Sequence, residues 1–329
     1  MANIVTFVGC FLHLLLIFVF STVLGEWNTK DYLKREHSLV KPYQSSGMNI
    51  PMWDIIGSTM VTNNYIRLTS DHQSKSGGIW NSQPVLVKNW ELHVQFRVHG
   101  TGRTLYGDGF CIWYVKDRMQ LGKVFGSRDL FSGLAIFLDT YSNHNGPHNH
   151  VHPYISAMVN NGSLSYDHDA DGTHTELSGC EAQFRNKDYD TFISIRYHEN
   201  TLKVFTDIDN KNNWKECFSV TGVHLPTGYY IGASAATGEL ADNHDVISIK
   251  LYELDVPGSV NPEDYKNIIP SAEHFAEPRE HVDDAPPASW SVWKIMLVII
   301  LLIIVFVVAG IVGIYFYQKH QEGNRKRFY

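Results

Sequence analysis

Short apolar segments separated by turn residues are the feature that most limits how this 329-residue chain can fold. From about Leu33 to Val256, no segment keeps the apolar period of a helix. Apolar and polar residues alternate along Leu92–Val98, as in a strand with one buried face. Phe110–Val115 and Leu134–Leu138 are almost wholly apolar, as in strands covered on both faces. This many strands in about 220 residues predicts one large β-sandwich rather than several small domains.

Turn residues predict where neighbouring strands pair. The segment Asn160-Asn161-Gly162 separates predicted strands at Tyr154–Val159 and Ser163–Tyr166, which is typical of a hairpin. A second hairpin is predicted from Phe192–Tyr197 and Leu202–Thr206.

The two ends of the chain carry apolar runs that do not belong to the sandwich. Met1–Gly25 has the apolar centre and small-residue end of a secretory signal peptide, with an uncleaved signal anchor as the alternative. Ile295–Tyr317 carries no charged residue and is long enough for a bilayer core, so residues 294–317 are predicted to form one transmembrane helix. Basic residues after it place the tail, residues 318–329, in the cytosol and everything before the span in the lumen.

Residues 257–290 lie between the predicted sandwich and the predicted span. Strand alternation stops there and proline recurs, at Pro257, Pro262, Pro270, Pro278, Pro286 and Pro287. This segment is predicted to be a stalk, with a short helix near Pro262–Ile269.

The four cysteines fit an oxidising lumen. Cys10 leaves with the signal peptide, and Cys111 lies in an apolar strand as a buried thiol does. We therefore predict a disulfide between Cys180 and Cys217, with two free thiols as the alternative. The sequon Asn161-Gly162-Ser163 predicts an N-glycan on Asn161. The net charge of −7 excludes a nucleic-acid partner.

Polar clusters that interrupt the apolar strands supply candidate metal ligands. Asp139 directly follows an apolar strand, and the Tyr141 carbonyl and the Asn143 side chain come from the same loop. Asp108 lies between two glycines, and the acidic turn Asp167–Gly172 follows the predicted hairpin. Calcium takes about six to eight oxygen ligands. We therefore expect the Asp139 loop and the acidic turn to share one calcium ion, with a hydrated acidic turn that binds no metal as the alternative.

The acidic turn and the loop after Asn143 each suggest another kind of metal site. The acidic turn matches the start of an EF-hand loop, but Ser178 occupies the twelfth position, where the bidentate Glu is required, so an EF-hand is excluded. The loop after Asn143 is rich in histidine, which suggests zinc or pH sensing. Its histidines are His144, His148, His150 and His152. Because zinc needs fixed geometry and this loop contains Gly146 and Pro147, a surface loop without a metal is the favoured interpretation.

No catalytic arrangement is recognisable in the sequence. A glycosidase needs two carboxyl groups that face each other across a cleft, and no strand carries alternating glutamates. No serine lies in the glycine motif of a nucleophile elbow. The sequence therefore predicts a binding protein and no enzyme.

Several longer segments resemble the animal L-type (leguminous-type) lectin family, especially its vesicular integral membrane and VIP-like lectins. The resemblance covers about Leu33–Val256 and extends to the tail Arg325–Tyr329. The segments that carry it are Gly107-Asp108-Gly109, Gly133–Tyr141, Tyr154-Ile155-Ser156, Asn160–His168 and Leu225–Tyr230. The resemblance implies a legume-lectin-like jelly roll and, as ligand, the α-mannose arms of high-mannose N-glycans.

The resemblance also implies which residues bind. The implied calcium ligands are Asp139, the Tyr141 carbonyl, Asn143 and Asp171. The implied sugar contacts are Ser74, Asp108, Asn143, His168, Gly238, Glu239 and Leu240, with Glu239 standing where close relatives have aspartate. The Cys180–Cys217 disulfide is implied as well. We further expect His168 to weaken binding as the pH falls, because an unperturbed imidazole titrates near about 6.5.

These features predict a calcium-dependent lectin that binds high-mannose glycoproteins between the endoplasmic reticulum and the Golgi, as a cargo or quality-control receptor. It would be a single-pass type I protein of the ER, intermediate-compartment or Golgi membrane. The alternatives are a membrane-anchored glycosidase on the same sandwich and a cargo scaffold that needs no sugar.

The short tail is predicted to carry sorting signals. Its basic residues, Arg325, Lys326 and Arg327, are interpreted as a signal for return to the ER, with plain positive-inside charge as the alternative. Phe328 and Tyr329 are interpreted as an export signal read by vesicle coat components.

Overall fold

The computed structural model describes residues 32–44, 49–143, 151–256 and 258–273, and in the C-terminal part residues 296, 300, 302–303 and 305–314. The chain divides into two units, Met1–Glu280 and His281–Tyr329. In the second unit, residues 305–314 are helical. Among the described residues, no helix combines the length and the apolar character that crossing a membrane requires. The predicted signal peptide (1–25), the predicted tail (318–329) and parts of the predicted span (294–317) lie outside the described residues.

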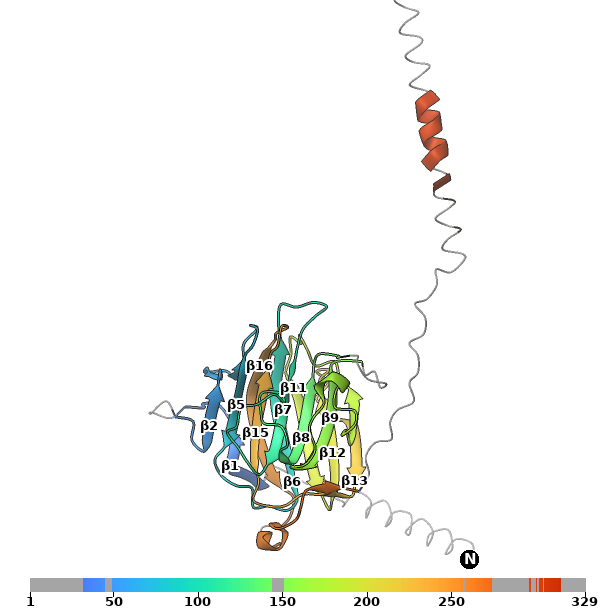
Figure 1. Cartoon of the computed structure of the whole chain (residues 1–329). Helices are drawn as coiled ribbons and strands as arrows, with labels where there is room; N and C mark the ends of the chain where they lie inside the picture. The colour runs from blue at the N-terminus through green and yellow to red at the C-terminus, as the bar shows by residue number, and fades with distance from the viewer. Residues whose placement is uncertain are drawn as a thin grey trace, which may run out of the picture. The chain divides into compact units, whose positions relative to one another are not determined.

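The first unit is a sandwich of two antiparallel sheets stacked face to face (Figure 1). The eight-stranded sheet contains, in spatial order, β13 (Lys215–Thr221), β12 (Thr201–Asp207), β11 (Thr191–His198), β6 (Trp90–His99), β16 (Asn243–Glu253), β4 (Ile66–Thr69) and β3 (Met60–Val61), with β1 (Leu33–Leu39) also paired to β16. The seven-stranded sheet contains β10 (Ser178–Glu181), β9 (Tyr154–Asn161), β8 (Ser132–Asp139), β7 (Gly109–Val115), β15 (Tyr230–Ala236), β5 (Ser76–Asn81) and β2 (Trp53–Gly57). The predicted all-β sandwich is confirmed.

The burial of two central strands explains their different sequence patterns. In β6 every second residue is buried between the sheets, as the alternation along Leu92–Val98 predicts. In β7 all residues are buried, because Phe110, Ile112 and Tyr114 enter the core between the sheets. Trp113 and its alternate neighbours enter a second apolar cluster on the other face of the sheet. Each large apolar side chain buried in this way stabilises the fold by about 1.5–3 kcal/mol before entropy is counted.

One predicted hairpin is confirmed and the other is not. β11 and β12 pair around Glu199 and Asn200, whose positive φ angles of 49° and 61° fit a tight two-residue turn. Residues 163–167 form no strand. The side chain of Asn160 explains the difference, because its amide oxygen accepts from the N–H groups of Gly162 and Leu164 and its amide nitrogen donates to the Leu164 carbonyl. These bonds turn the chain away from β9.

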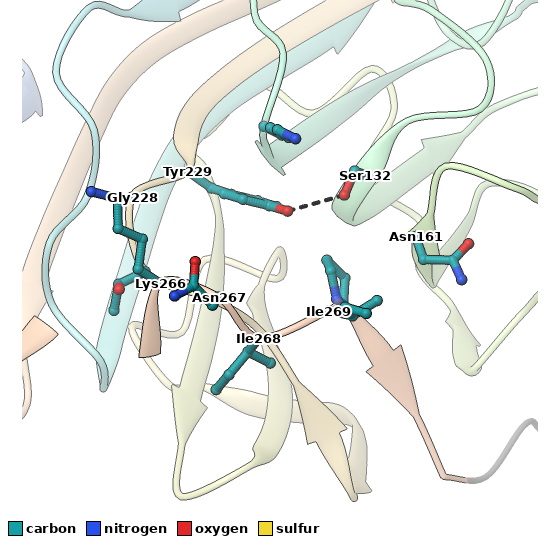
Figure 2. Close-up of a pocket in the computed structure, with 11 residues that line it drawn as sticks. Ser132, Asn161, Gly228, Tyr229, Lys266, Asn267, Ile268 and Ile269 are labelled. Atoms are coloured by element: carbon teal, nitrogen blue, oxygen red, sulfur yellow. Dashed lines mark hydrogen bonds between the residues drawn. The ribbon is translucent and has the colours of Figure 1, made fainter. Parts of the chain in front are cut away.

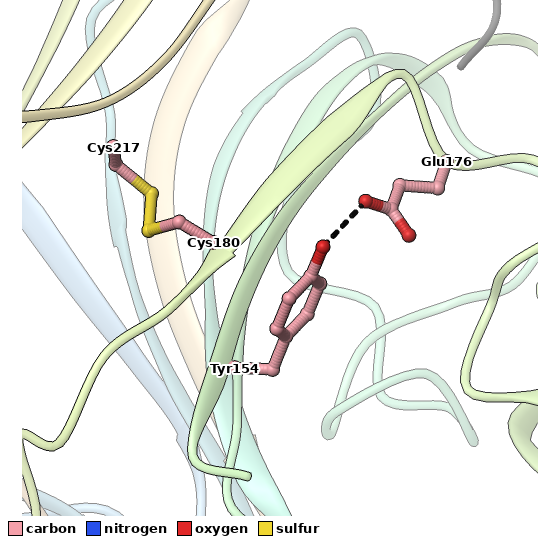
Figure 3. The surroundings of a disulfide bond; sticks show 4 residues. All are labelled: Tyr154, Glu176, Cys180 and Cys217. Atoms are coloured by element: carbon pink, nitrogen blue, oxygen red, sulfur yellow. Dashed lines mark hydrogen bonds between the residues drawn. A yellow bond between two sulfur atoms is a disulfide. The ribbon is translucent and has the colours of Figure 1, made fainter. Parts of the chain in front are cut away.

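A disulfide joins the outer strands of the two sheets (Figure 3). Cys180 of β10 and Cys217 of β13 are bonded, with 5.4 Å between their Cα atoms. This confirms the predicted pair, and Cys111 is buried as a free thiol. The bond closes a loop of 37 residues, which corresponds to about 4 kcal/mol of stabilisation through the unfolded chain. It links β10, the first strand after the acidic turn, to β13 of the other sheet.

The start of the predicted stalk contains a short helix within the predicted range, but it also contains a strand that was not predicted. Residues 262–265 form a short 3₁₀ helix, Pro262–Tyr265, and Ser271–Ala272 form β17, which pairs with β14 (Val223–His224). The hydroxyl of Thr227 donates to the Pro262 carbonyl at 2.6 Å, and Glu273 N–H donates to the Gly222 carbonyl at 3.0 Å. Residues 258–273 are therefore packed on the sandwich, because backbone pairing satisfies the polar groups that a free stalk leaves to water.

Candidate metal centre and ligand site

Asp139 and Asp171 come together at one end of the seven-stranded sheet. Asp139 is the last residue of β8, and Asp171 follows a single 3₁₀ turn, His168–Ala170, in the acidic segment. The two residues are only 7% and 9% exposed. Together with His152 they offer ligand atoms that all lie within 4.8 Å of one another. The structure thus brings together the two loops that the sequence predicts to share an ion.

The loop after Asp139 is hydrogen-bonded to both carboxylates. Tyr141 N–H donates to Asp139 Oδ1 at 3.0 Å, and Asn143 N–H donates to Asp171 Oδ1 at 3.0 Å. These bonds hold Tyr141 and Asn143, the other two predicted calcium ligands, next to the acidic pair. The donors collected here are mostly oxygens, which suits a hard cation such as calcium.

The acidic pair carries excess negative charge. Burial raises the pKa of Asp139 well above its usual value, and the charge of Asp171 raises it further. The hydrogen bond from Tyr141 opposes this rise, and the carboxylate of Asp108 adds to it. Two ionised carboxylates buried this close repel each other, so the pair favours uptake of a proton or of a cation. The pair is therefore a suitable site for a bound cation.

His152 belongs to this cluster, which the sequence analysis did not predict. Its side chain is 5% exposed, and its Nε2 lies 3.8 Å from Asp139 Oδ2. The predicted surface position is therefore wrong for His152, whereas the absence of a metal from the histidine-rich loop stays a prediction. Residues 144–150, with the other three histidines, lie outside the described residues. The one feature of the sequence that could have indicated burial of His152 is its position directly before Pro153 and the buried strand β9.

Asp108 lies near Asp139, directly before the neighbouring strand β7. Its carbonyl accepts hydrogen bonds from the N–H and the hydroxyl of Thr140, both at 2.9 Å. Among the described residues, nothing hydrogen-bonds to its carboxylate. Burial raises the pKa of this carboxyl to about 6. Asp108 is thus a strong acceptor that is held in place by its backbone and left open to a ligand.

Residues Gly238–Leu240, which we call the Gly238 loop, face Asp108. A methyl group at Gly238 would lie 3.3 Å from both carboxylate oxygens of Asp108. The Gly238 carbonyl accepts from Ser74 N–H at 3.0 Å, and the Glu239 carbonyl accepts from the side chain of Gln73 at 2.7 Å. The side chain of Glu239 is exposed. The structure thus groups Ser74, Asp108 and the Gly238 loop at the mouth of the site.

The same packing joins these residues to the metal loop. A Cβ atom placed on Gly107 would lie 3.1 Å from Cβ of Tyr141 and 3.6 Å from Cβ of Leu240. The absence of a side chain at position 107 lets the three loops approach one another. The predicted ion ligand Tyr141 and the predicted sugar contact Leu240 are therefore packed against the same backbone position.

His168 begins the 3₁₀ turn that precedes Asp171, and it is less able to sense pH than the sequence predicts. Its Nε2 and the Lys123 carbonyl are 2.8 Å apart, and its ring packs against Phe125 and Tyr166. Burial lowers the pKa of His168 below its usual value. The imidazole therefore becomes protonated at a lower pH than an unperturbed histidine does.

Asn161, the predicted glycosylation residue, lies at the opposite end of the same strands. Asp139 pairs with Tyr154 at the site end of β8 and β9, whereas Ser132 pairs with Asn161 at the other end. Asn161 is exposed and borders a hollow of about 640 Å³ between the sheet and residues 266–270 (Figure 2). Tyr229 and Ser132 share a hydrogen bond of 3.0 Å there. A glycan on Asn161 would leave the acidic site uncovered.

The raised pKa of Asp139 predicts how pH acts on the metal-free protein. Its folded state binds a proton more tightly than the unfolded chain does, so metal-free wild type gains stability as the pH falls from neutral towards about 4. Asp139→Asn keeps an oxygen for Tyr141 N–H and carries no charge. In EDTA this variant is expected to be more stable than wild type at pH 7.5, and the difference is expected to shrink by pH 5. Thermal unfolding followed by circular dichroism measures it, and a difference that does not change with pH would contradict the argument.

Comparison with known proteins places the chain in a family. The Legume-like lectin family matches residues 30–261. Vesicular integral-membrane protein VIP36 of Homo sapiens is 57% identical over 258 residues, which cover 77% of this chain and 72% of that protein. VIP36-like protein of Mus musculus is 50% identical over 305 residues, which cover 91% and 86%. The crystal structure of the VIP36 exoplasmic/lumenal domain in its Ca²⁺/Man3GlcNAc-bound form matches with a TM-score of 0.69 at 57% identity, covering 74% of this chain and 100% of that one. The chain belongs to the legume-like lectin family.

Proposed function

We propose that this protein is a calcium-dependent lectin that binds the mannose arms of high-mannose N-glycans and acts as a cargo or quality-control receptor between the ER and the Golgi. The observation that carries the proposal is the buried pair Asp139 and Asp171 beside the open carboxylate of Asp108. The solved VIP36 domain, which is similar to this chain, has Ca²⁺-bound and Ca²⁺/Man-bound forms, and this supports the same ligands here.

The ion would be held by oxygen atoms from two loops. Asp139 and Asp171 supply carboxylates, Tyr141 its carbonyl and Asn143 its side-chain amide oxygen. The positions of these residues fit, since Asn143 N–H already donates to Asp171 and Tyr141 N–H to Asp139. Bound calcium would neutralise the acidic pair and fix the loop that carries Asn143.

The sugar would be held beside the ion by polar groups of several loops. Asp108 would accept hydrogen bonds from mannose hydroxyls, Asn143 would donate as well as accept them, and the ring of His168 would add a further contact. The remaining contacts would come from Ser74 and from the Gly238 loop, in which Glu239 is exposed. Neutral and anionic acceptors in a fixed array suit a hydroxyl-rich ligand.

A glycan array probed with and without calcium tests the proposal. We expect binding to high-mannose glycans in calcium and none in EDTA. Release of free sugar from these glycans would support a glycosidase instead. Binding to cargo polypeptide that persists in EDTA and needs no glycan would support the scaffold.

We also propose a type I membrane topology for the chain. Residues 1–25 would be the signal peptide, 294–317 the span and 318–329 the cytosolic tail, with a stalk in the remainder of 257–290 after Glu273. The uncharged run Ile295–Tyr317 and the basic tail support this orientation. Location in ER, intermediate-compartment or Golgi membranes, and an N-glycan on Asn161, belong to the same proposal.

The tail proposal predicts opposite shifts for two variants. Replacing Arg325, Lys326 and Arg327 with serine removes the return signal, so the protein is expected to move towards the Golgi or the cell surface. Replacing Phe328 and Tyr329 with alanine removes the export signal and is expected to retain it in the ER. Fluorescence imaging of the full chain measures both shifts. If both variants are distributed like the wild type, the tail does not set location.

A further inference from the structure

A buried ion pair lies directly behind the loops that face the proposed sugar. Arg185 donates two hydrogen bonds to Asp242, from Nε to Oδ2 and from Nη2 to Oδ1, both at 2.7 Å. The side chains are 7% and 0% exposed. Such a bidentate pair fixes the plane of the guanidinium group as well as its position.

The Arg185–Asp242 pair is close to the Gly238 loop and to the segment that leads to Asp108. Asp242 comes two residues after Leu240, the end of the Gly238 loop. The guanidinium carbon of Arg185 lies 3.8 Å from the ring centroid of Tyr106, two residues before Asp108. A methyl group on Gly100 would lie 2.1 Å from Asp242 Oδ1, so the carboxylate is also packed against the start of the segment 100–108, which we call the Asp108 loop.

Arg185 itself is held by the core of the sandwich. Its neighbour Phe184 is buried, and the N–H of Asn186 donates to the Val98 carbonyl at 2.9 Å. The Asn186 side chain accepts from Gly100 N–H at 3.1 Å. The guanidinium group is therefore a fixed platform, whose edge binds Asp242 while its face supports Tyr106.

We propose that Arg185 is a positioning residue, which through Tyr106 and Asp242 holds the Asp108 loop and the Gly238 loop at the spacing that mannose requires. This inference rests on the proposed lectin function. Removal of the Tyr106 ring frees the Asp108 loop and leaves the buried ion pair intact. Mannose affinity therefore depends on a residue that neither the sugar nor the ion contacts.

The test uses the full chain and compares three tyrosine variants. Tyr106→Leu is expected to lower mannose affinity about tenfold, with calcium affinity unchanged and the thermal midpoint near that of wild type. Tyr106→Phe keeps the ring and is expected to restore wild-type affinity. Tyr265→Leu is the matched control, because Tyr265 stacks on Lys88, 4.3 Å from the ring centroid, on the 3₁₀ helix Pro262–Tyr265. It is expected to bind mannose normally.

A fourth variant separates charge from geometry. Arg185→Lys keeps a positive charge for Asp242. Because lysine lacks the paired N–H donors and the planar guanidinium group that contacts Tyr106, this variant is expected to bind mannose as weakly as Tyr106→Leu. Isothermal titration with mannose and with calcium gives all these affinities. Wild-type mannose affinity in Tyr106→Leu would overturn this inference and leave the proposed lectin function standing. Absence of mannose binding by the wild-type protein in calcium would overturn the proposed function and this inference together.

Discussion

Removal of calcium is expected to abolish mannose binding and to leave the sandwich folded. Asp139 and Asp171 are buried together, and without a cation their carboxylates repel each other. The loop with Tyr141 and Asn143 is hydrogen-bonded to both carboxylates, so it moves with them. The core between the sheets and the Cys180–Cys217 disulfide do not depend on the ion.

Asp139→Ala is expected to give the same result with calcium present. Truncation of one partner of a buried charge pair costs about 2–5 kcal/mol of binding free energy, so calcium affinity, and with it mannose affinity, is expected to fall by about 30-fold or more. Asp209→Ala is the matched control, because Asp209 is a surface acid paired with Lys211 and Lys215. Isothermal titration gives the affinities and circular dichroism the fold. Mannose affinity that is unchanged in EDTA would refute the metal interpretation.

Local patterns predicted the sandwich well, because strand burial repeats every two residues. The alternation in β6 and the apolar run in β7 both correspond to the faces that the structure buries. The first hairpin prediction failed because the side chain of Asn160 binds the next turn, and propensity does not report such a bond. The strand at the start of the predicted stalk was missed because β17 pairs with β14, which lies far from it in the sequence.

The candidate site was predictable where it depends on residue type and less so where it depends on packing. Asp139 follows an apolar strand and Asp171 lies in the acidic turn after the next strand, so the sequence predicted that the two side chains lie close together. The burial of His152 depends on how the loop returns to β9. Burial lowers the pKa of His168, whose ring packs against Phe125, which is far away in sequence, and against Tyr166. The Arg185–Asp242 pair has no sequence signal, because its partners are 57 residues apart.

Asp108→Asn is expected to weaken mannose binding about 10- to 100-fold while calcium still binds. The change keeps the shape of the side chain and removes the charge that makes Asp108 a strong acceptor for sugar hydroxyls, a difference of about 1.5–3 kcal/mol. The backbone of residue 108, which binds Thr140, is untouched, so the loop remains in place. Asp169→Asn is the control, since Asp169 is an exposed acid in the neighbouring acidic turn.

The same variant distinguishes a role of the Asp108 carboxylate in sugar binding from a role in the backbone turn or in ion binding. If Asp108 serves only the backbone turn, mannose affinity in Asp108→Asn will equal that of wild type in isothermal titration. If it serves the ion, calcium affinity will fall together with mannose affinity. The structure favours the sugar role, because the Asp108 carboxylate faces Gly238 and Asp139 is the residue next to Asp171. A selective loss of mannose affinity is therefore the expected result, and its pairing with the calcium-dependent loss in Asp139→Ala assigns one acid to each ligand.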